Sequence, residues 1–402
     1  MLKILTVFGT RPEAIKMAPL VQELKRCSRQ INCLVAVTAQ HREMLDQVLR
    51  LFAIRPDYDL NIMRPEQSLF EITGRALAGL EEVFTRERPD LVLVHGDTTT
   101  TFVAALAAFY LQIPVGHVEA GLRTHNKYSP FPEEINRHLT AVLTDLHFAP
   151  TATAKANLLA EGIPARKIFV TGNTVIDALL ATVRPEYSFD NPELDGIDYE
   201  QKKVLLVTTH RRENLGEPLR FFYRALRSVV QDHPEVEVVF PVHKNPAVAG
   251  AAHEELGGVK RVHLVEPMAY EPFVNLMQRS YLVLTDSGGL QEEAPALGKP
   301  VLVLRNTTER PEAVQAGTVR VVGTEPGAVA AAVCRLLEDR EHYRQMAEAV
   351  NPYGDGRAAQ RICRAILYHF GIFPEPPDEY VPEKSQKNFR VSGRIYGGPC
   401  RN

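Results

Sequence analysis

The chain has 402 residues, of which 45% are hydrophobic and 24% are charged, and its formal net charge is −3. These values are typical of an ordinary globular protein with two or three domains. Because no overall basic field is present, the composition argues against a nucleic-acid partner.

No feature of the sequence indicates a membrane or an oxidising compartment. The chain opens with the strand-like KILTVF rather than a signal-peptide core, and no run reaches the roughly 18 apolar residues of a membrane helix. Its five cysteines form no C-x-x-C pair, and their odd number fits reduced thiols better than a disulfide framework. We therefore expect a cytoplasmic protein without a membrane partner.

Short apolar runs alternate with amphipathic stretches in the first half of the chain. The alternation predicts crossover units and a doubly wound parallel sheet in an α/β fold. The expected strands are Ile4–Phe8, Leu34–Thr38, Leu91–Val94, Val115–Val118 and Ile168–Val170. The expected helices are Glu13–Arg26, Arg42–Phe52, Leu69–Arg86, Thr99–Leu111, Glu133–Thr144 and Thr153–Glu161. Pro19 is expected to kink or end the first helix.

The alternation is interrupted and then restarts. Residues 184–203 contain two prolines and no apolar period, so we expect a linker there between a first domain over residues 1–183 and a second over 204–356. Strands are expected in the second domain at Val204–Thr208, Val236–Val242, Val262–Val265, Leu282–Leu284, Val301–Leu304 and Val319–Val322. Two such halves facing each other make a cleft.

The C-terminal part changes character. A helix is expected over residues 357–371, and it could belong to either half. Residues 372–402 combine prolines with a basic stretch, so we expect a tail that is weakly ordered or packed on the surface. Nucleic-acid binding by this tail is the less favoured alternative.

Three acidic residues follow apolar runs or begin a helix. Asp97 and Glu119 lie about one strand-plus-helix repeat apart, so neighbouring strands are expected to carry both to one sheet edge, where α/β proteins bind ligands. Each has a simpler alternative: Asp97 could cap a helix, and Glu133 after Pro132 could complement a helix dipole. Glu119 is harder to dismiss, because an unpaired acid in an apolar strand is costly. Together they predict acid–base chemistry.

Basic and glycine-rich motifs point to an anionic ligand. Arg11 follows the first strand and could hold a phosphate, with Lys16 a turn further along, although both could be surface charges. One glycine there does not make a G-x-G-x-x-G fingerprint, which argues against NAD. In TDSGGLQEEA, Gly288 and Gly289 precede a helix whose N–H groups could bind a diphosphate, and Glu293 could accept ribose hydroxyls.

Many longer motifs occur in one order: FGTRPEAIKMAP, HGDTTTT, GHVEAGLRT, PEEINR, TGNTVIDAL, THRREN, PVHKNP, TDSGGLQEEAP and TTERPEAV. The chain is similar, over about Leu2–Ile366, to the bacterial non-hydrolysing UDP-N-acetylglucosamine 2-epimerases. The resemblance implies a GT-B-like α/β fold of two Rossmann-like domains facing a central cleft, with the C-terminal helix returning to the first. It also implies that UDP-N-acetylglucosamine and UDP-N-acetylmannosamine interconvert without NAD, another cofactor or a metal.

The resemblance assigns roles to residues that match the family motifs. The implied catalytic residues are Asp97, Glu119, Glu133 and His210. The implied substrate-binding residues are Arg11, Lys16, Arg137, Met268, Phe273, Ser287, Gly288, Gly289, Glu293 and Arg310. An allosteric site for UDP-N-acetylglucosamine is implied at Gln40, Gln67, Arg211 and His243. A homodimer is implied as well.

The family chemistry eliminates UDP to form 2-acetamidoglucal and then adds UDP back, and the product serves surface polysaccharide synthesis. Which acid removes the C2 proton stays open. Three alternatives also stay open: a glycosyltransferase, a hydrolysing epimerase and a non-catalytic sensor of the sugar nucleotide.

Overall fold

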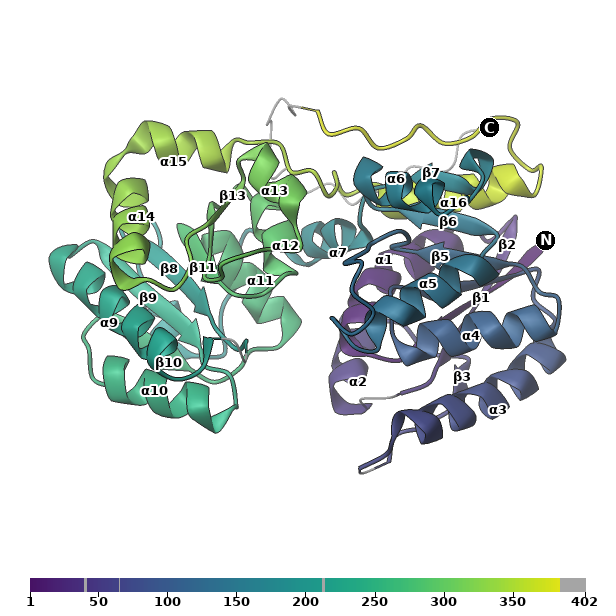
Figure 1. Ribbon diagram of the computed structural model, residues 1–402, viewed down its shortest axis with the longest axis horizontal. Coiled ribbons are helices and arrows are strands. Elements are labelled where there is room, and N and C mark those ends of the chain that lie inside the picture. The colour runs from purple at the N-terminus through teal and green to yellow at the C-terminus, as the bar shows by residue number, and fades with distance from the viewer. Residues whose placement is uncertain (40–41, 65, 212–213, 384–402) are drawn as a thin grey trace. The chain divides into compact units, whose positions relative to one another are not determined.

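The computed structural model describes residues 1–39, 42–64, 66–211 and 214–383, which divide into two compact units (Figure 1). Unit 1 is formed by Met1–Leu180 and Tyr353–Val381, and unit 2 mainly by Ala181–Pro352. Residues 184–203 are not an extended connection: they include helix α8 (Pro192–Asp195) and bury Phe189, Leu194 and Ile197. They therefore belong to the second unit.

Unit 1 is built on a seven-stranded sheet in the order β3-β2-β1-β4-β5-β6-β7, and every pairing in it is parallel. The strands are β1 (Leu2–Phe8), β2 (Ile31–Val37), β3 (Tyr58–Asp59), β4 (Leu91–His95), β5 (Val115–Val118), β6 (Leu146–Ala149) and β7 (Ile168–Val170). Their apolar residues are largely buried, as expected of parallel strands covered on both faces. Strands β3 and β6 are not predicted by the sequence pattern, because two residues give no period and His147 interrupts the apolar run of β6.

Several helices of unit 1 begin with a side-chain cap. Helix α1 starts with a capping box between Thr10 and Glu13, and α3 with one between Ser68 and Glu71. The helices are α1 (Arg11–Arg26), α2 (Arg42–Leu51), α3 (Leu69–Glu87), α4 (Thr99–Tyr110), α5 (Glu133–Leu143), α6 (Ala152–Ala160), the 3₁₀ turn η1 (Ala165–Lys167), α7 (Thr174–Thr182) and α16 (Ala358–His369). Helix α1 continues through the buried Pro19, which therefore does not end it.

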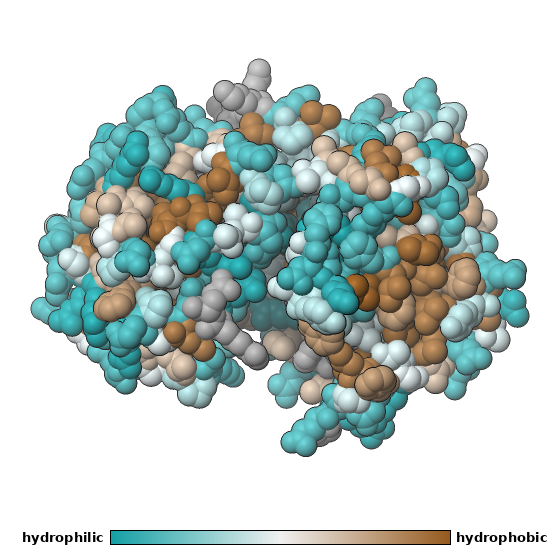
Figure 2. All heavy atoms as spheres, in the orientation of Figure 1, coloured by the Kyte–Doolittle hydropathy of each residue, from teal (hydrophilic) through white to brown (hydrophobic). Residues whose placement is uncertain are grey.

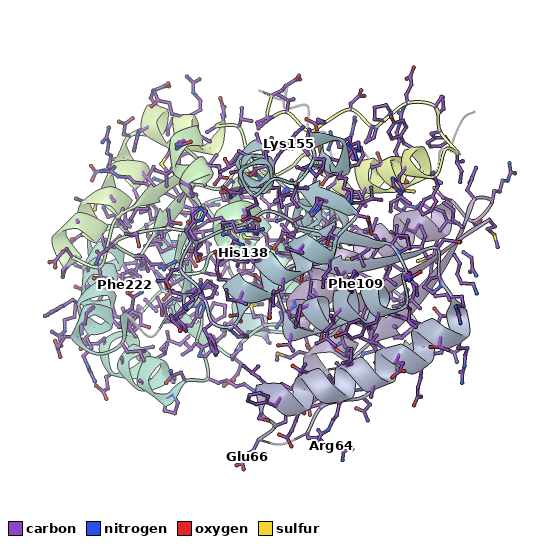
Figure 3. All side chains as sticks on the ribbon, turned by 45° about the vertical axis from the view of Figure 1, so that its right-hand side comes forward. Arg64, Glu66, Phe109, His138, Lys155 and Phe222 are labelled. Carbon is purple, nitrogen blue, oxygen red and sulfur yellow. The ribbon has the colours of Figure 1, made fainter. Side chains whose placement is uncertain are left out.

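Unit 2 repeats the architecture with six parallel strands in the order β10-β9-β8-β11-β12-β13. The strands are β8 (Lys203–Thr208), β9 (Val236–Pro241), β10 (Val262–Val265), β11 (Leu282–Thr285), β12 (Val301–Val303) and β13 (Val319–Val321). The helices are α9 (Glu217–Asp232), α10 (Pro246–Leu256), α11 (Tyr270–Arg279), α12 (Leu290–Ala296), α13 (Pro311–Ala316), α14 (Pro326–Glu338) and α15 (Arg340–Ala347). Phe222, labelled in Figure 3, and Tyr223 are fully buried in its core.

Helix α16 carries the chain back to unit 1. It packs against α1, and the N–H groups of Ala358 and Ala359 at its start donate to the Asp177 carboxylate, at 3.2 and 2.9 Å. The described part of the following tail lies on unit 1, where the Tyr380 N–H donates to Val170 O at 2.8 Å and Lys155 pairs with Glu379. Residues 384–402 lie outside the described chain.

These observations confirm the expected α/β fold of two Rossmann-like domains with a C-terminal helix that returns to the first. No helix in the described part of the chain combines the length and the apolar character needed to cross a membrane.

The buried carboxyl of Asp177 predicts a pH-dependent attachment of α16. Burial raises the pKa of Asp177 to about 7, although the two backbone N–H groups oppose this rise. A raised folded-state pKa means that this group's stabilising contribution is complete below its unfolded value, near pH 4, and is lost as the pH rises through about 7. We expect the melting temperature of the wild type, relative to Asp177→Asn, to fall by at least about 2–4 °C between pH 5 and 8, measured by calorimetry.

Asp195 provides the control. It also accepts a backbone N–H, from Phe189 at 2.7 Å, but this bond lowers the pKa of Asp195. The Asp195→Asn variant should keep the pH dependence of the wild type, and an unchanged profile in Asp177→Asn would contradict the assignment.

Candidate active site

The polar residues of unit 1 gather where its strand order reverses, at the carboxyl ends of β1 and β4. Strand β5 pairs with β4 in the register His95↔Val118, so Asp97 and Glu119 follow neighbouring strand ends, as their spacing predicts. Helix α1 begins just beyond β1 and carries Arg11 and Lys16. This edge is the position at which open α/β sheets bind ligands.

Glu119 is the most constrained of the acids. Its backbone is left-handed, with φ 62°, and its side chain is only 8% exposed. One oxygen, Oε2, accepts hydrogen bonds from Lys16 Nζ and from Asn173 Nδ2, the latter at 3.0 Å. Three elements, α1, β5 and the loop before α7, therefore converge on a single carboxylate oxygen.

The electrostatic environment keeps Glu119 ionised. Burial alone raises the pKa of its carboxyl, but the charges of Lys16 and His95, together with the hydrogen bond from Lys16, outweigh burial and hold the pKa well below its usual range. Glu119 is thus a carboxylate at neutral pH and can accept a proton from a ligand. Its second oxygen, Oε1, accepts no hydrogen bond from any described residue.

Two buried histidines, His95 and His117, lie on the strands that end at this edge of the sheet. His95, at the end of β4, is 3% exposed, and its Nε2 lies 3.6 Å from Glu119 Oε2. Neither of its ring nitrogens has a hydrogen-bond partner among the described residues. On the next strand, burial lowers the pKa of His117 to about 3, so its neutral ring bonds Gly96 O at 2.7 Å and fixes the turn before Asp97.

Asp97 is held by an arginine. Arg137 donates from Nε and Nη2 to Asp97 Oδ2, at 2.8 and 2.6 Å, which leaves Oδ1 without a hydrogen bond from the described residues. The cap of helix α4 is Thr98, whose hydroxyl accepts the Thr101 N–H. The helix-capping alternative for Asp97 is therefore wrong.

Glu134 supports the arginine. Its Oε2 accepts from Arg137 Nη1 at 2.9 Å, while Oε1 accepts from the N–H groups of Thr124 and His125 at 3.0 and 2.9 Å. Burial raises the pKa of Glu134, but these bonds and Arg137 outweigh it and lower the pKa overall. Glu133 is half-buried at the start of α5, and its side chain makes no hydrogen bond or ion pair with the described residues.

Unit 2 contains a second organised group, again where the strand order reverses. His210 follows β8 and Asp286 follows the neighbouring β11, and His210 Nδ1 lies 3.0 Å from Asp286 Oδ1. The fully buried Asp286 also accepts the N–H groups of His210 and Arg211 and the amide of Asn214. Because Nδ1–H points to Asp286, Nε2 of His210 is the nitrogen left for a ligand.

The glycine-rich turn lies beside this pair. Gly288 is buried, and a Cβ there would come within 2.5 Å of Glu309 Oε1, so a side chain would force a rearrangement. Gly289 is exposed and immediately precedes α12, while the Ser287 N–H bonds Thr285 Oγ1 at 2.9 Å. The turn thus holds the backbone close to the end of β11.

The expected nucleotide-binding side chains lie around α11 and α12. Tyr270 donates to Glu293 Oε1 at 3.1 Å, whereas Arg310 pairs with Glu292. Met268 lies just before α11 and Phe273 in its first turn, and both are half-buried.

The expected allosteric residues occupy both units. Gln67 accepts from Arg64 N and Arg75 Nη1 at 3.1 and 3.3 Å in unit 1. In unit 2 the exposed His243 stacks on His210 with ring centroids 5.8 Å apart, and Arg211 Nη2 lies 3.6 Å from Glu309. Gln40 lies outside the described residues. The allosteric assignment stays a prediction.

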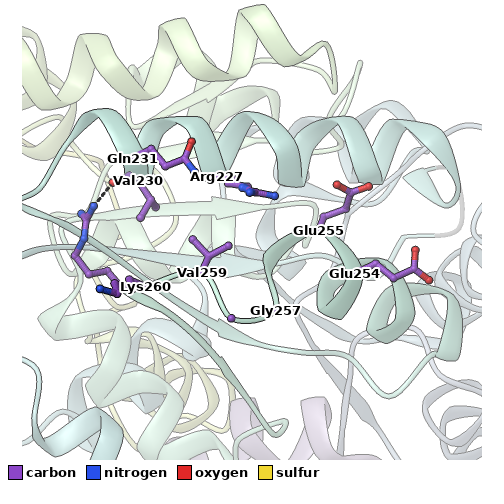
Figure 4. Close-up of a pocket in the computed structure, with 10 residues that line it drawn as sticks. Arg227, Val230, Gln231, Glu254, Glu255, Gly257, Val259 and Lys260 are labelled. Carbon is purple, nitrogen blue, oxygen red and sulfur yellow. Dashed lines mark hydrogen bonds between the residues drawn. The ribbon is translucent and has the colours of Figure 1, made fainter.

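A cavity of about 390 Å³ lies elsewhere in unit 2, between α9 and α10 (Figure 4). It is lined by Arg227, Glu254, Glu255 and Lys260 among others, and by none of the expected site residues. Its mixed charge indicates no single ligand class.

The residues of these networks that the sequence motifs did not predict include His95, Asn173 and Asp286. Each stands within or beside a quoted motif, two residues before Asp97 in HGD, in TGNTVIDAL and in TDSGG. The motifs do not show which residues contact one another, because these contacts form only when the chain is folded.

The Lys16–Glu119 pair predicts a large effect of breaking it. The variant Lys16→Met leaves a buried carboxylate without its cation, so we expect the free energy of unfolding in urea to fall by about 3–5 kcal/mol. Adding Glu119→Gln to Lys16→Met should restore part of this loss.

Lys155→Met is the matched control. Lys155 pairs with Glu379 at 2.6 Å, but the two side chains are 25% and 42% exposed, so its loss should cost about 1 kcal/mol or less. If both lysine variants lowered the free energy of unfolding equally, the buried Glu119 carboxylate would need its cation no more than the exposed Glu379 does.

Comparison with known proteins identifies the family. The sequence model described as UDP-N-acetylglucosamine 2-epimerase matches residues 22–367. The UDP-N-acetylglucosamine 2-epimerase of Bacillus subtilis is 58% identical over 380 residues, which cover 94% of this chain and 99% of that protein.

Solved structures agree. A chain from Listeria monocytogenes is 52% identical with a TM-score of 0.90, covering 94% of this chain and 99% of that one. The UDP-GlcNAc 2-epimerase of Neisseria meningitidis, solved with UDP-GlcNAc bound, is 53% identical with a TM-score of 0.80, covering 91% and 100%. The chain therefore belongs to the UDP-N-acetylglucosamine 2-epimerase family and is an isomerase.

Proposed function

We propose that the protein inverts C2 of the sugar in UDP-N-acetylglucosamine to give UDP-N-acetylmannosamine, reversibly and without hydrolysis. The observation that carries the proposal is the pair of carboxylates at neighbouring strand ends, Asp97 and Glu119. Each has one oxygen fixed by a cation and one that accepts no hydrogen bond from the described residues. Such groups can exchange a proton with a bound substrate.

The reaction proceeds by elimination and re-addition. A base removes the C2 proton, the C2–H electrons form a C1=C2 double bond, and the C1–O bond breaks to release UDP and 2-acetamidoglucal. UDP then adds back at C1 while a proton is delivered to the opposite face of C2. The base is one of Asp97, Glu119 and Glu133.

Unit 2 supplies the groups for the departing diphosphate. His210, oriented through Nδ1 by Asp286, donates from Nε2 to a phosphate oxygen when both ring nitrogens carry a proton, and the backbone of Ser287–Gly289 adds N–H donors. Phe273 and Met268 bind the uracil, and Glu293 binds the ribose. Arg310 acts beside them through its pair with Glu292.

Incubation in D₂O followed by NMR tests the reaction. Elimination and re-addition place deuterium at C2 while UDP stays attached. Free N-acetylmannosamine with UDP would instead show a hydrolysing epimerase, a requirement for an acceptor would show a transferase, and unlabelled substrate would show a sensor.

Three substitutions test the catalytic residues. We expect Asp97→Asn, Glu119→Gln and His210→Asn each to lower kcat at least about a hundredfold with the fold intact, because each removes a proton-handling group. The measurement is the initial rate of epimerisation, with circular dichroism to check folding.

Asp90→Asn is the matched control. Asp90 stands before β4, at the other end of the strand that Asp97 follows, and accepts the Lys3 N–H at 2.8 Å. Its variant should turn over at a near-normal rate. Near-normal rates in all three test variants would remove the catalytic assignment.

We also propose that the protein is a homodimer, formed through the outer face of α4 and α5. Large apolar side chains are exposed there, including Phe109 (Figure 3) and Tyr110 at the end of α4. On α5, Ile135, Leu139 and Val142 repeat every three to four residues and so share one face. Helices α4 and α5 pack together, and hydrophobic residues gather over them (Figure 2). Exposed apolar patches of this kind mark interaction sites. In a two-fold symmetric dimer, the same face of a second copy packs against this one.

A charge in this face should separate the subunits. Val142 is 80% exposed, so Val142→Asp should leave the monomer folded but desolvate a carboxylate in the dimer. We expect light scattering after gel filtration to shift from dimer to monomer at micromolar concentration. Val381→Asp, a valine 64% exposed on the tail, is the control and should remain dimeric.

We place this activity in the cytoplasm, where it supplies UDP-N-acetylmannosamine for cell-surface polysaccharide synthesis. Cys27, Cys33, Cys334 and Cys363 are free thiols, which suits a reducing compartment.

A further inference from the structure

A histidine, a cysteine and a glutamate meet at one end of unit 2. His233 follows α9, and Cys334 and Glu338 lie one turn apart near the end of α14, which packs against α9 (Figure 1). His233 Nε2 is 3.6 Å from Cys334 Sγ and 3.9 Å from Glu338 Oε1. One ligand atom from each residue lies within 4.8 Å of the others.

These separations fit a tetrahedral metal ion. With a zinc–sulfur distance of about 2.3 Å and a zinc–nitrogen distance of about 2.0–2.1 Å, two tetrahedral ligands are roughly 3.6 Å apart. The histidine–cysteine pair already has this spacing. Glu338 is 69% exposed, so its side chain can turn to shorten the longer contact.

A neighbouring carboxylate orients the histidine. Glu235 Oε1 lies 3.4 Å from His233 Nδ1, and Lys203 Nζ lies 3.7 Å from the same oxygen. This partner favours a proton on Nδ1 and leaves the Nε2 lone pair toward Cys334 and Glu338. Carboxylate–histidine pairs of this kind accompany most metal-ligating histidines.

The scaffold beneath the three residues is rigid. Val333 and Leu337, which directly precede Cys334 and Glu338, are buried in the core of unit 2, as is Val229, one helical turn before His233. Arg261 also donates to His233 O at 2.7 Å. The backbones that carry the ligands are therefore fixed, and binding would cost little reorganisation.

We propose that His233, Cys334 and Glu338 bind one Zn²⁺ ion, with the fourth position left to water. A thiolate, an imidazole and a carboxylate suit this borderline ion, whereas Mg²⁺ and Ca²⁺ prefer oxygen ligands. The ion would join the ends of α9 and α14 and so stabilise unit 2. None of its ligands belongs to the proposed reaction, so the site is independent of the epimerase activity.

Cobalt titration of the reduced, full-length protein tests the site. We expect one equivalent of Co²⁺ to give a thiolate charge-transfer band and the visible bands of four-coordinate cobalt, and Zn²⁺ to abolish them. Cys334→Ser should lose the charge-transfer band, His233→Gln should weaken binding at least tenfold, and Glu338→Gln should weaken it less. Saturating Zn²⁺ should raise the melting temperature of the wild type and of the Cys33→Ser control, but not that of Cys334→Ser.

Cys33→Ser is the matched control, since Cys33 is also partly exposed but lies in β2, outside the cluster. It should bind cobalt as the wild type does. Absence of the charge-transfer band in the wild type, its loss in Cys33→Ser or its survival in Cys334→Ser would each overturn the proposal. Circular dichroism confirms that each variant is folded.

Discussion

Both sheets reverse their strand order at one place, and this constraint decides where chemistry can occur. The reversal lies between β1 and β4 in unit 1 and between β8 and β11 in unit 2. The helices after two such strands leave on opposite faces of the sheet, so the strand ends between them stay uncovered. Lys16 and Asp97 follow the first pair of strands, and His210 and Asp286 follow the second. One topological rule thus creates a polar edge in each unit.

A polar edge also imposes an energetic constraint. An ionised carboxylate with little exposure is several kcal/mol unfavourable unless cations or N–H donors surround it. Glu119 meets this demand with Lys16 from another element, whereas Asp286 meets it with the His210 ring and with backbone N–H groups of the loop after β8. The two edges are therefore held together by ion pairs and hydrogen bonds to these carboxylates.

The sequence predicts well where most strands end, but it predicts poorly which side chains contact one another at those ends. Parallel strands are continuous apolar runs, so the polar residues that follow them can be located from the period alone. The contact between Lys16 and Glu119 spans 103 residues, and no local pattern encodes it. The phase of α5 is equally hidden: a shift of one residue turns the helix by about 100°, so the motif PEE could not show that Glu134, rather than Glu133, enters the buried network.

Four carboxylates of the two edges, those of Asp97, Glu119, Glu134 and Asp286, differ in which of their oxygens accept hydrogen bonds from the protein. In Glu134 and Asp286 both oxygens accept hydrogen bonds from the chain, so a substrate could bind them only by displacing those donors. In Asp97 and Glu119 all bonds from the described residues fall on one oxygen. The arginine and the lysine therefore fix the orientation of these two groups without consuming their capacity to accept a proton. The two pairs of carboxylates differ in their second oxygen, which the protein occupies in Glu134 and Asp286 but not, among the described residues, in Asp97 and Glu119.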